Sequence, residues 1–117
     1  MQTYQGNCHC GNITFEFQAE TITQGLRGNC SLCKRKGTVM LPDTLKSEDL
    51  QIKVHNESLA TYEFGNNVAK HHFCKNCGIY TFHQTMRKPG EYRVNLACID
   101  EIDPFSLEVD VFDGASL

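Results

Sequence analysis

Apolar residues alternate with polar ones along much of this chain, with a period of two. The alternating apolar sets are Ile13, Phe15 and Phe17; Leu50, Ile52 and Val54; Tyr92, Val94, Leu96 and Cys98; and Leu107, Val109 and Val111. A period of two places each set on one face of a β-strand. We therefore expect short, half-buried strands at these four places.

Turn-forming residues separate the expected strands. They occur at Leu41-Pro42-Asp43, Gly65-Asn66-Asn67, Lys88-Pro89-Gly90 and Asp103-Pro104. No segment keeps a helical period for three turns, although a short helical turn can begin at Ser47, with that side chain as its cap. Because we find no linker and no low-complexity tract, we expect residues 1–117 to form a single all-β domain.

Composition and charge narrow the class of protein. The chain has 117 residues and a net charge of -3, and its acidic and basic residues are interspersed. This argues against a nucleic-acid partner, which requires a basic surface. The sequence shows no secretory signal and no apolar run of about 20 residues, so we expect no membrane association and a cytoplasmic location. In a reducing compartment, seven cysteines are better explained as metal ligands or reactive thiols than as disulfides.

Four cysteines form two closely spaced pairs that lie far apart in the sequence. They are Cys8 and Cys10 in a C-x-C pair, and Cys74 and Cys77 in a C-x-x-C pair. Four thiolates suit the closed tetrahedral shell of a structural zinc, although such a site also admits iron. Gly11 and Gly78 follow the two pairs, and glycine easily adopts the positive φ of a ligand turn. We therefore predict a structural zinc, with unliganded thiols or a disulfide as the alternative.

A third pair, Cys30 and Cys33, has metal-ligand spacing but offers only two sulfurs. Two thiolates leave half of a tetrahedral shell to other ligands. The basic run Lys34-Arg35-Lys36 follows directly. It is explained either as a solvated turn or as a positive field that lowers a thiol pKa and attracts the carboxylates of a thiol such as glutathione.

Other side chains can complete or assist this pair in the fold. His71, His72 and His83 flank the Cys74 segment and are candidate replacement ligands, although a strand histidine is more often solvated or hydrogen-bonded. Cys98 is a further candidate, but it continues an apolar face, where a small core residue is expected. The acidic residues Asp100, Glu101 and Asp103 are expected in a solvated loop.

Five stretches of the chain resemble one known family. They are GNCHCGNITFEF, NCSLCKRKG, HHFCKNCGIYTFH, VNLACID and the terminal FDG. In this order and spacing they resemble the glutathione-dependent formaldehyde-activating enzyme family, which includes the centromere protein V group. The resemblance implies a β-tent fold of short antiparallel strands, with a structural zinc on Cys8, Cys10, Cys74 and Cys77.

The resemblance also implies an activity and a second zinc. The implied reaction is that of a carbon-sulfur lyase, which makes or breaks an adduct between a thiol such as glutathione and a small aldehyde, for example S-hydroxymethylglutathione. The family carries a catalytic zinc on a C-x-C-x-x-C motif. Cys30 and Cys33 match the second and third cysteines of this motif, whereas Gly28 stands at the first.

Three hypotheses therefore remain. The chain is a lyase in which Cys30 and Cys33 are catalytic and hold a second, incomplete zinc site. Alternatively, it is a zinc-stabilised scaffold or binding module, whose catalytic site decayed when position 28 lost its cysteine. In the third hypothesis, Cys30 and Cys33 are a C-x-x-C redox pair, although no thioredoxin-like βαβ pattern surrounds them.

Overall fold

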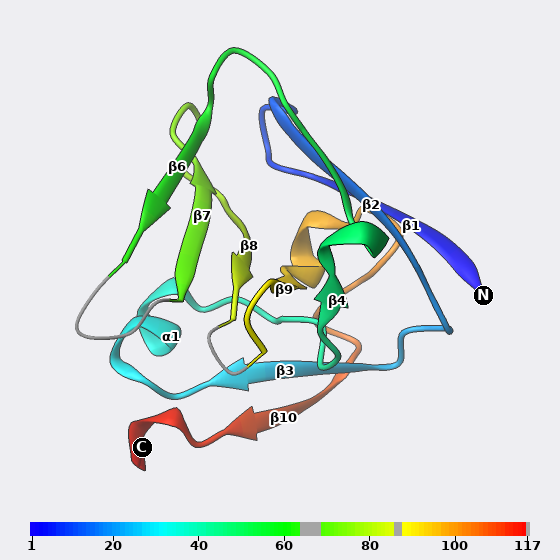
Figure 1. The fold of residues 1–117 in the computed structure, drawn as a ribbon. Coiled ribbons are helices and arrows are strands. Elements are labelled where there is room, and N and C mark those ends of the chain that lie inside the picture. Colours follow the sequence, from blue (N-terminus) through cyan, green and yellow to red (C-terminus); the bar gives the residue numbers. More distant parts are fainter. Residues whose placement is uncertain (64–68, 86–87, 117) are drawn as a thin grey trace.

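Figure 1 shows a computed structural model of the chain, which describes residues 1–63, 69–85 and 88–116. Ten strands in these residues form three sheets. The expectation of an all-β fold is therefore confirmed. No helix of the described residues is long and apolar enough to cross a membrane.

Each sheet joins strands that lie far apart in the sequence. The first contains β1 (Gln2–Asn7), β2 (Ile13–Ala19) and β5 (Gln51–Val54) in the order β1-β2-β5. The second pairs β3 (Gln24–Gly28) with β10 (Glu108–Phe112). The third has the order β4-β9-β8-β7-β6, built from β4 (Leu45–Lys46), β6 (Leu59–Tyr62), β7 (Lys70–Cys74), β8 (Tyr80–Gln84) and β9 (Glu91–Val94).

One strand pair departs from the antiparallel pairing that we expected. The pairs of the first and third sheets are antiparallel, whereas β3 and β10 are parallel and lie side by side along the bottom of Figure 1. Parallel strands need a long connection, and here most of the chain separates the two. As a result, the C-terminal segment lies beside the helix α1 (Ser31–Lys36), which follows β3.

The first expected strand packs as its alternation predicts. Ile13, Phe15 and Phe17 of β2 are buried, and the Phe15 ring meets the edge of the Phe82 ring with centroids 6.1 Å apart. Phe82 lies on β8, so this contact joins the first sheet to the third. The core therefore lies between these two sheets.

The other apolar sets agree only in part with the prediction. Leu50 is buried before β5, but Val54 at the end of that strand is 39% exposed. Strand β10 forms as expected and pairs with β3, yet Val111 is 65% exposed. The turn expected at Gly65-Asn66-Asn67 lies outside the described residues.

Two short helical turns also differ from expectation. β9 ends at Val94, and the next residues form the 3-10 helix η2 (Leu96–Cys98), where the Asn95 side chain accepts the Ala97 N–H at 3.1 Å. The expected strand is therefore too long, although Leu96 and Cys98 are both buried. The turn near Ser47 is present as η1 (Ser47–Asp49), but Lys46 is its N-cap, without a side-chain hydrogen bond. A third 3-10 helix, η3 (Gly114–Ser116), follows β10.

Candidate metal centre and candidate active site

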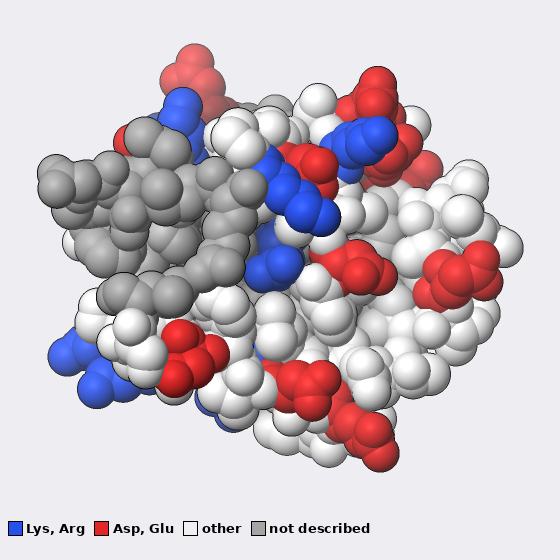
Figure 2. Space-filling model, turned by 60° about the horizontal axis from the view of Figure 1, so that its bottom comes forward, with Lys and Arg blue, Asp and Glu red and all other residues white. Residues whose placement is uncertain are grey.

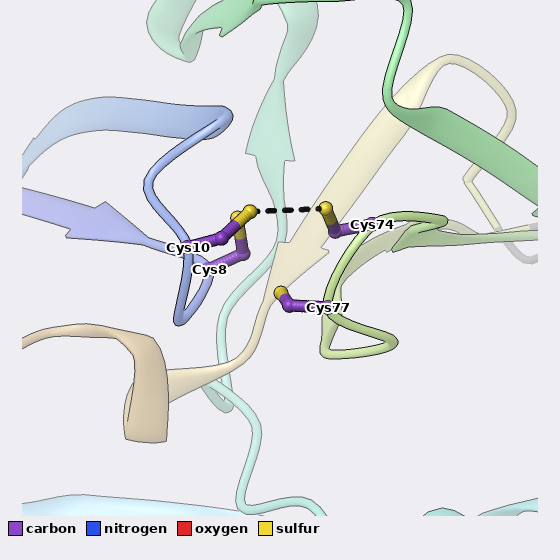
Figure 3. Close-up of side chains that lie close together, drawn as sticks. All are labelled: Cys8, Cys10, Cys74 and Cys77. Atoms are coloured by element: carbon purple, nitrogen blue, oxygen red, sulfur yellow. Dashed lines mark hydrogen bonds between the residues drawn. The ribbon is translucent and has the colours of Figure 1, made fainter.

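The four outer cysteines come together at the ends of two hairpins (Figure 3). The loop after β1 carries Cys8 and Cys10, while Cys74 ends β7 and Cys77 lies in the turn before β8. All four Sγ atoms lie within 4.8 Å of one another, with Cys8 to Cys10 at 3.7 Å and Cys10 to Cys74 at 3.6 Å. Zinc–sulfur bonds of about 2.3 Å in a tetrahedron require sulfurs roughly 3.8 Å apart. The four sulfurs can therefore hold one metal ion, and their spacing is consistent with zinc.

Both ligand turns have the backbone geometry that the glycines predicted. Gly11 has φ +84° and Gly78 has φ +79°, so each supplies the left-handed residue after the second cysteine of its pair. The Ile13 N–H donates to Cys8 Sγ at 3.3 Å. Burial raises the pKa of Cys77, but hydrogen bonds from the backbone N–H groups of Cys10 and Ile79, together with those from the Cys74 and Cys8 side chains, lower that pKa to about 6. The backbone thus favours a thiolate at Cys77.

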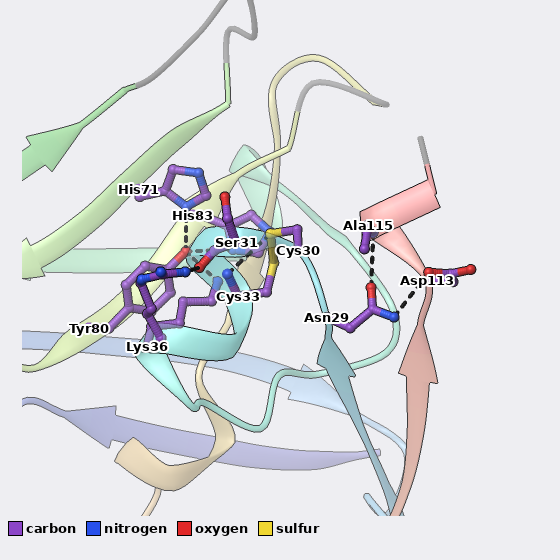
Figure 4. Close-up of a disulfide and its surroundings, with 11 residues drawn as sticks. Asn29, Cys30, Ser31, Cys33, Lys36, His71, Tyr80, His83, Asp113 and Ala115 are labelled. Atoms are coloured by element: carbon purple, nitrogen blue, oxygen red, sulfur yellow. Dashed lines mark hydrogen bonds between the residues drawn. A yellow bond between two sulfur atoms is a disulfide. The ribbon is translucent and has the colours of Figure 1, made fainter.

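The middle pair has a different structure. A disulfide joins Cys30 and Cys33 across the first turn of α1, with the Cα atoms 4.9 Å apart (Figure 4). Cys30 is the N-cap of this helix, and its Sγ accepts the Cys33 N–H at 3.1 Å. Because metal ligation requires thiolates, the oxidised pair cannot serve as ligands.

The side chains that we considered as replacement ligands have other partners. His71 and His83 both bind the Tyr80 hydroxyl, His72 binds Thr61 at 2.9 Å, and the Cys98 thiol donates to the Tyr80 carbonyl at 3.6 Å. Among the described residues, only the outer four cysteines form a group of three or more metal-ligating side chains within reach of one ion. The described residues therefore do not fit a second metal ion beside Cys30 and Cys33.

A cavity of about 340 Å³ lies beside Cys33. Its described lining is Leu26, Gly28, Cys33, Lys36, Met40, Ala69, His71, His83, Thr85, Arg93 and Phe112. The described part of the lining includes two cations and no carboxylate, while charges of both signs are spread over the face in Figure 2. The cavity is thus a locally positive site that suits a small anionic ligand.

Four polar side chains form a hydrogen-bonded network at the wall of this cavity. The Tyr80 hydroxyl lies 3.0 Å from Lys36 Nζ, 2.7 Å from His71 Nδ1 and 2.9 Å from His83 Nδ1. A phenol oxygen accepts two hydrogen bonds and donates one. Lys36 donates, so one histidine donates and the other accepts. The network is therefore satisfied when both imidazoles are neutral and in opposite tautomers.

Burial determines which member of the network changes charge near neutral pH. It lowers the pKa of Lys36 to about 8, with help from the charge of Arg93. Burial and the charge of Lys36 lower the pKa of His71 to about 4 and that of His83 to about 3. Burial also raises the pKa of Tyr80. Of these four groups, Lys36 alone gains or loses a proton between pH 7 and 9.

Comparison with known proteins identifies the family. Residues 3–114 match the family described as glutathione-dependent formaldehyde-activating enzyme. The chain belongs to this family. A solved relative of similar structure is a Rhodobacter sphaeroides protein, a Northeast Structural Genomics target. It is 35% identical, with a TM-score of 0.77, over 91% of this chain and 99% of that chain.

Within this formaldehyde-activating enzyme fold, Gly28 is tightly enclosed. A Cβ atom at this position would lie 2.7 Å from Cys33 Sγ and 2.8 Å from Cys33 Cβ. Gly28 is not among the glycines with positive φ, so its backbone accepts other residues. The lack of space beside the disulfide, rather than the backbone conformation, therefore disfavours a cysteine at this position.

We expect Gly28→Cys to disrupt the Cys30–Cys33 disulfide and to raise the zinc bound per chain under reducing conditions, because three thiolates can retain an ion. Gly28→Ser is the matched control: it fills the same space without a third sulfur, so it should disrupt the disulfide but bind no additional zinc. Elemental mass spectrometry measures the zinc. Equal zinc in the two folded variants would show that no latent site exists.

Several residues at this cavity are not evident as site residues from the sequence. Lys36 was part of a basic run that a solvated turn also explained, yet its side chain is half-buried. Lys36 lies three residues after Cys33, so a helical turn places both side chains on the same side. This spacing was the sequence signal that could have identified Lys36 as a site residue. Tyr80 and Arg93 carried no signal of their own.

Proposed function

We propose that this member of the family is a carbon-sulfur lyase for thiol–aldehyde adducts, such as S-hydroxymethylglutathione, and that the adduct binds in the cavity beside Cys33. The observation that carries the proposal is the absence of carboxylates from the described lining, together with the presence of Lys36 and Arg93. A thiolate product and the carboxylates of glutathione are anions that these two cations stabilise.

Lys36 is the proposed acid–base group. Its neutral amine accepts the proton of the adduct hydroxyl, the carbon–sulfur bond breaks with its electron pair on sulfur, and the aldehyde carbonyl forms. The Lys36 ammonium and the Arg93 guanidinium then face the new thiolate. Formation of the adduct follows the same steps in reverse, so the proton returns to the oxygen.

We keep Cys30 and Cys33, in their reduced form, as catalytic residues, because Cys33 is part of the cavity lining. We also place a zinc ion on Cys8, Cys10, Cys74 and Cys77. That ion stabilises the fold by joining the two ligand loops, and no catalytic step passes through it. A cytoplasmic location and a single domain over residues 1–117 remain predictions.

The test is the rate of adduct cleavage, measured by exchange NMR with ¹³C-formaldehyde and glutathione. Excess reduced glutathione under an inert atmosphere keeps the protein reduced. The neutral fraction of Lys36 grows as pH rises, so the protein-dependent rate should rise with pH through about 8 and then level off. Lys36→Met should lower this rate by about a hundredfold, as expected for loss of an acid–base group.

Lys34→Met is the matched control, because Lys34 is exposed on the same helix and should not affect the rate. A Lys36→Met variant with the wild-type rate would remove Lys36 from the mechanism. A wild-type protein that does not exceed the protein-free rate would refute the lyase proposal. The scaffold hypothesis, which is favoured because the described residues form no second group of metal ligands, would then be the better explanation.

A further inference from the structure

We propose that Cys30 and Cys33 form a dithiol–disulfide redox couple that exchanges electrons with small anionic thiols at the Cys33 sulfur. In this chain the couple occupies the place of the family's second metal site. The redox proposal does not depend on the lyase proposal, because it concerns a separate reaction with its own measurement.

The local geometry of the pair favours a bond between the two sulfurs. With Gly28 at the first motif position, the described residues supply no third ligand, and the two remaining sulfurs are close enough to bond to each other. Their Cα separation of 4.9 Å lies in the usual range for disulfides. Both cysteines are partly exposed rather than enclosed in the core, so a small thiol can reach the bond.

The two sulfurs of the disulfide also differ in how easily a small thiol can reach them. Cys33 is part of the described lining of the cavity, whereas Cys30 is not. A Cβ on Gly114 would lie 3.3 Å from Cys30 Cβ, so the C-terminal segment packs against Cys30. An incoming thiolate therefore reaches the Cys33 sulfur first.

Asn29 holds the C-terminal segment against Cys30, as Figure 4 shows. Its backbone N–H donates to the Phe112 carbonyl at 3.2 Å, and its side-chain amide donates to Asp113 Oδ1 at 3.0 Å. The Ala115 N–H donates to Asn29 Oδ1 at 2.9 Å. These contacts keep Cys30 covered on one side.

The backbone at Cys33 stabilises the leaving group of the exchange. When a thiolate attacks Cys33 Sγ, a new sulfur–sulfur bond forms to Cys33, and Cys30 Sγ leaves with the electron pair. The Cys33 N–H already points at Cys30 Sγ at 3.1 Å and stabilises that thiolate. A second thiolate then attacks the bound thiol's sulfur, which releases a small disulfide and leaves Cys33 as a thiolate. Two thiols are thereby oxidised, and the protein disulfide is reduced.

The charge of the cavity selects the thiol. Lys36 and Arg93 line it with Cys33, and no carboxylate is part of its described lining. Lys36 also lines a second hollow, where Asp100 and His9 are present, so the positive field is strongest on the Cys33 side. Thiols that carry a negative charge are therefore expected to react faster than cationic ones.

The first experiment equilibrates the full chain, with its zinc, in mixtures of reduced and oxidised glutathione. The samples are quenched in acid and alkylated under denaturing conditions, and the labels are counted by intact mass. The count should change reversibly between seven and five across the series, with zinc retained. Cys98→Ser, which removes a buried cysteine outside the pair, should keep this two-label step. A label count that stays constant across the series would overturn the proposal. A change in the count that is accompanied by loss of zinc would also overturn it.

Single-cysteine variants test which sulfur is attacked. Cys30→Ser should form a mixed disulfide at Cys33 about tenfold faster than Cys33→Ser forms one at Cys30, because Cys30 is covered. Equal rates would contradict attack at Cys33. Both variants retain the outer four cysteines, so unchanged zinc content and melting show that they are folded.

The choice of thiol tests the role of charge. At low salt and equal thiolate concentration, 2-mercaptoethanesulfonate should reduce the wild-type disulfide about tenfold faster than cysteamine. This preference should shrink in Lys36→Met and remain in Lys34→Met. An equal rate for the two thiols in the wild-type protein would contradict selection by the cavity.

Discussion

Cys77→Ser is expected to abolish the cooperative fold of this chain. Binding of a structural zinc contributes about 10–16 kcal/mol, whereas a domain of this size has a free energy of unfolding of about 5–15 kcal/mol. The four sulfurs lie at a spacing that suits one ion, and they join the β1–β2 loop to the β7–β8 turn. Loss of one thiolate should release the zinc. The contact between the first and third sheets at this end should then be lost as well. Circular dichroism melting and zinc content measure the result.

Cys98→Ser is the control for this variant. Cys98 is also buried, but its sulfur is not one of the four. We expect it to keep the zinc and a cooperative melting transition, with at most a modest loss of stability. If Cys77→Ser kept both the zinc and the wild-type melting temperature, the four cysteines would not be a structural metal site.

Phe82→Ala should produce the second largest loss of stability. Phe82 is 1% exposed and lies on the central strand of the third sheet. Its ring contacts Phe15 from the first sheet and Tyr92 from β9, with centroids 6.1 and 5.9 Å away. Removal of a buried phenylalanine ring costs about 3–5 kcal/mol, because the cavity that it leaves does not collapse fully. We expect a fall in melting temperature of roughly 15 °C, measured with zinc present.

Phe105→Ala is the matched control, since the same ring is 96% exposed at that position. Its melting temperature should stay close to that of the wild type. A similar fall in both variants would show that the core does not lie between the first and third sheets.

Some of this fold was predictable from the sequence because its signals are local. β2 lies between β1 and β5 and has one buried face, so its alternation of apolar residues shows directly which side chains form the core. The outer cysteines carried two local signals, namely their spacing and the glycine after each pair. Both signals arise within a single turn, where spacing along the chain determines geometry.

Other features depend on how distant segments pack, and sequence spacing does not contain that information. Val111 alternates as regularly as Phe15, yet Val111 is 65% exposed whereas Phe15 is buried. The network at Tyr80 combines Lys36 of α1, His71 of β7 and His83 of β8. No local pattern brings these residues together.

The disulfide was the least expected result, because a reducing compartment argued against it. Its position follows from a local feature, since Cys30 caps α1 and Cys33 lies one turn later. Gly28 explains why the pair bonds to itself: it supplies no third sulfur and leaves room for Cys33 Sγ. The same substitution thus removes a metal ligand and makes space for the disulfide.

The central claim is that this chain keeps the structural zinc of its family and replaces the second metal site by a cysteine pair. The most direct test is the zinc-to-protein ratio of the chain purified under reducing conditions without chelator, compared with a Cys30→Ser/Cys33→Ser variant. We predict about one zinc per chain in both proteins. A ratio near two in the wild type that falls to one in the variant would contradict the claim.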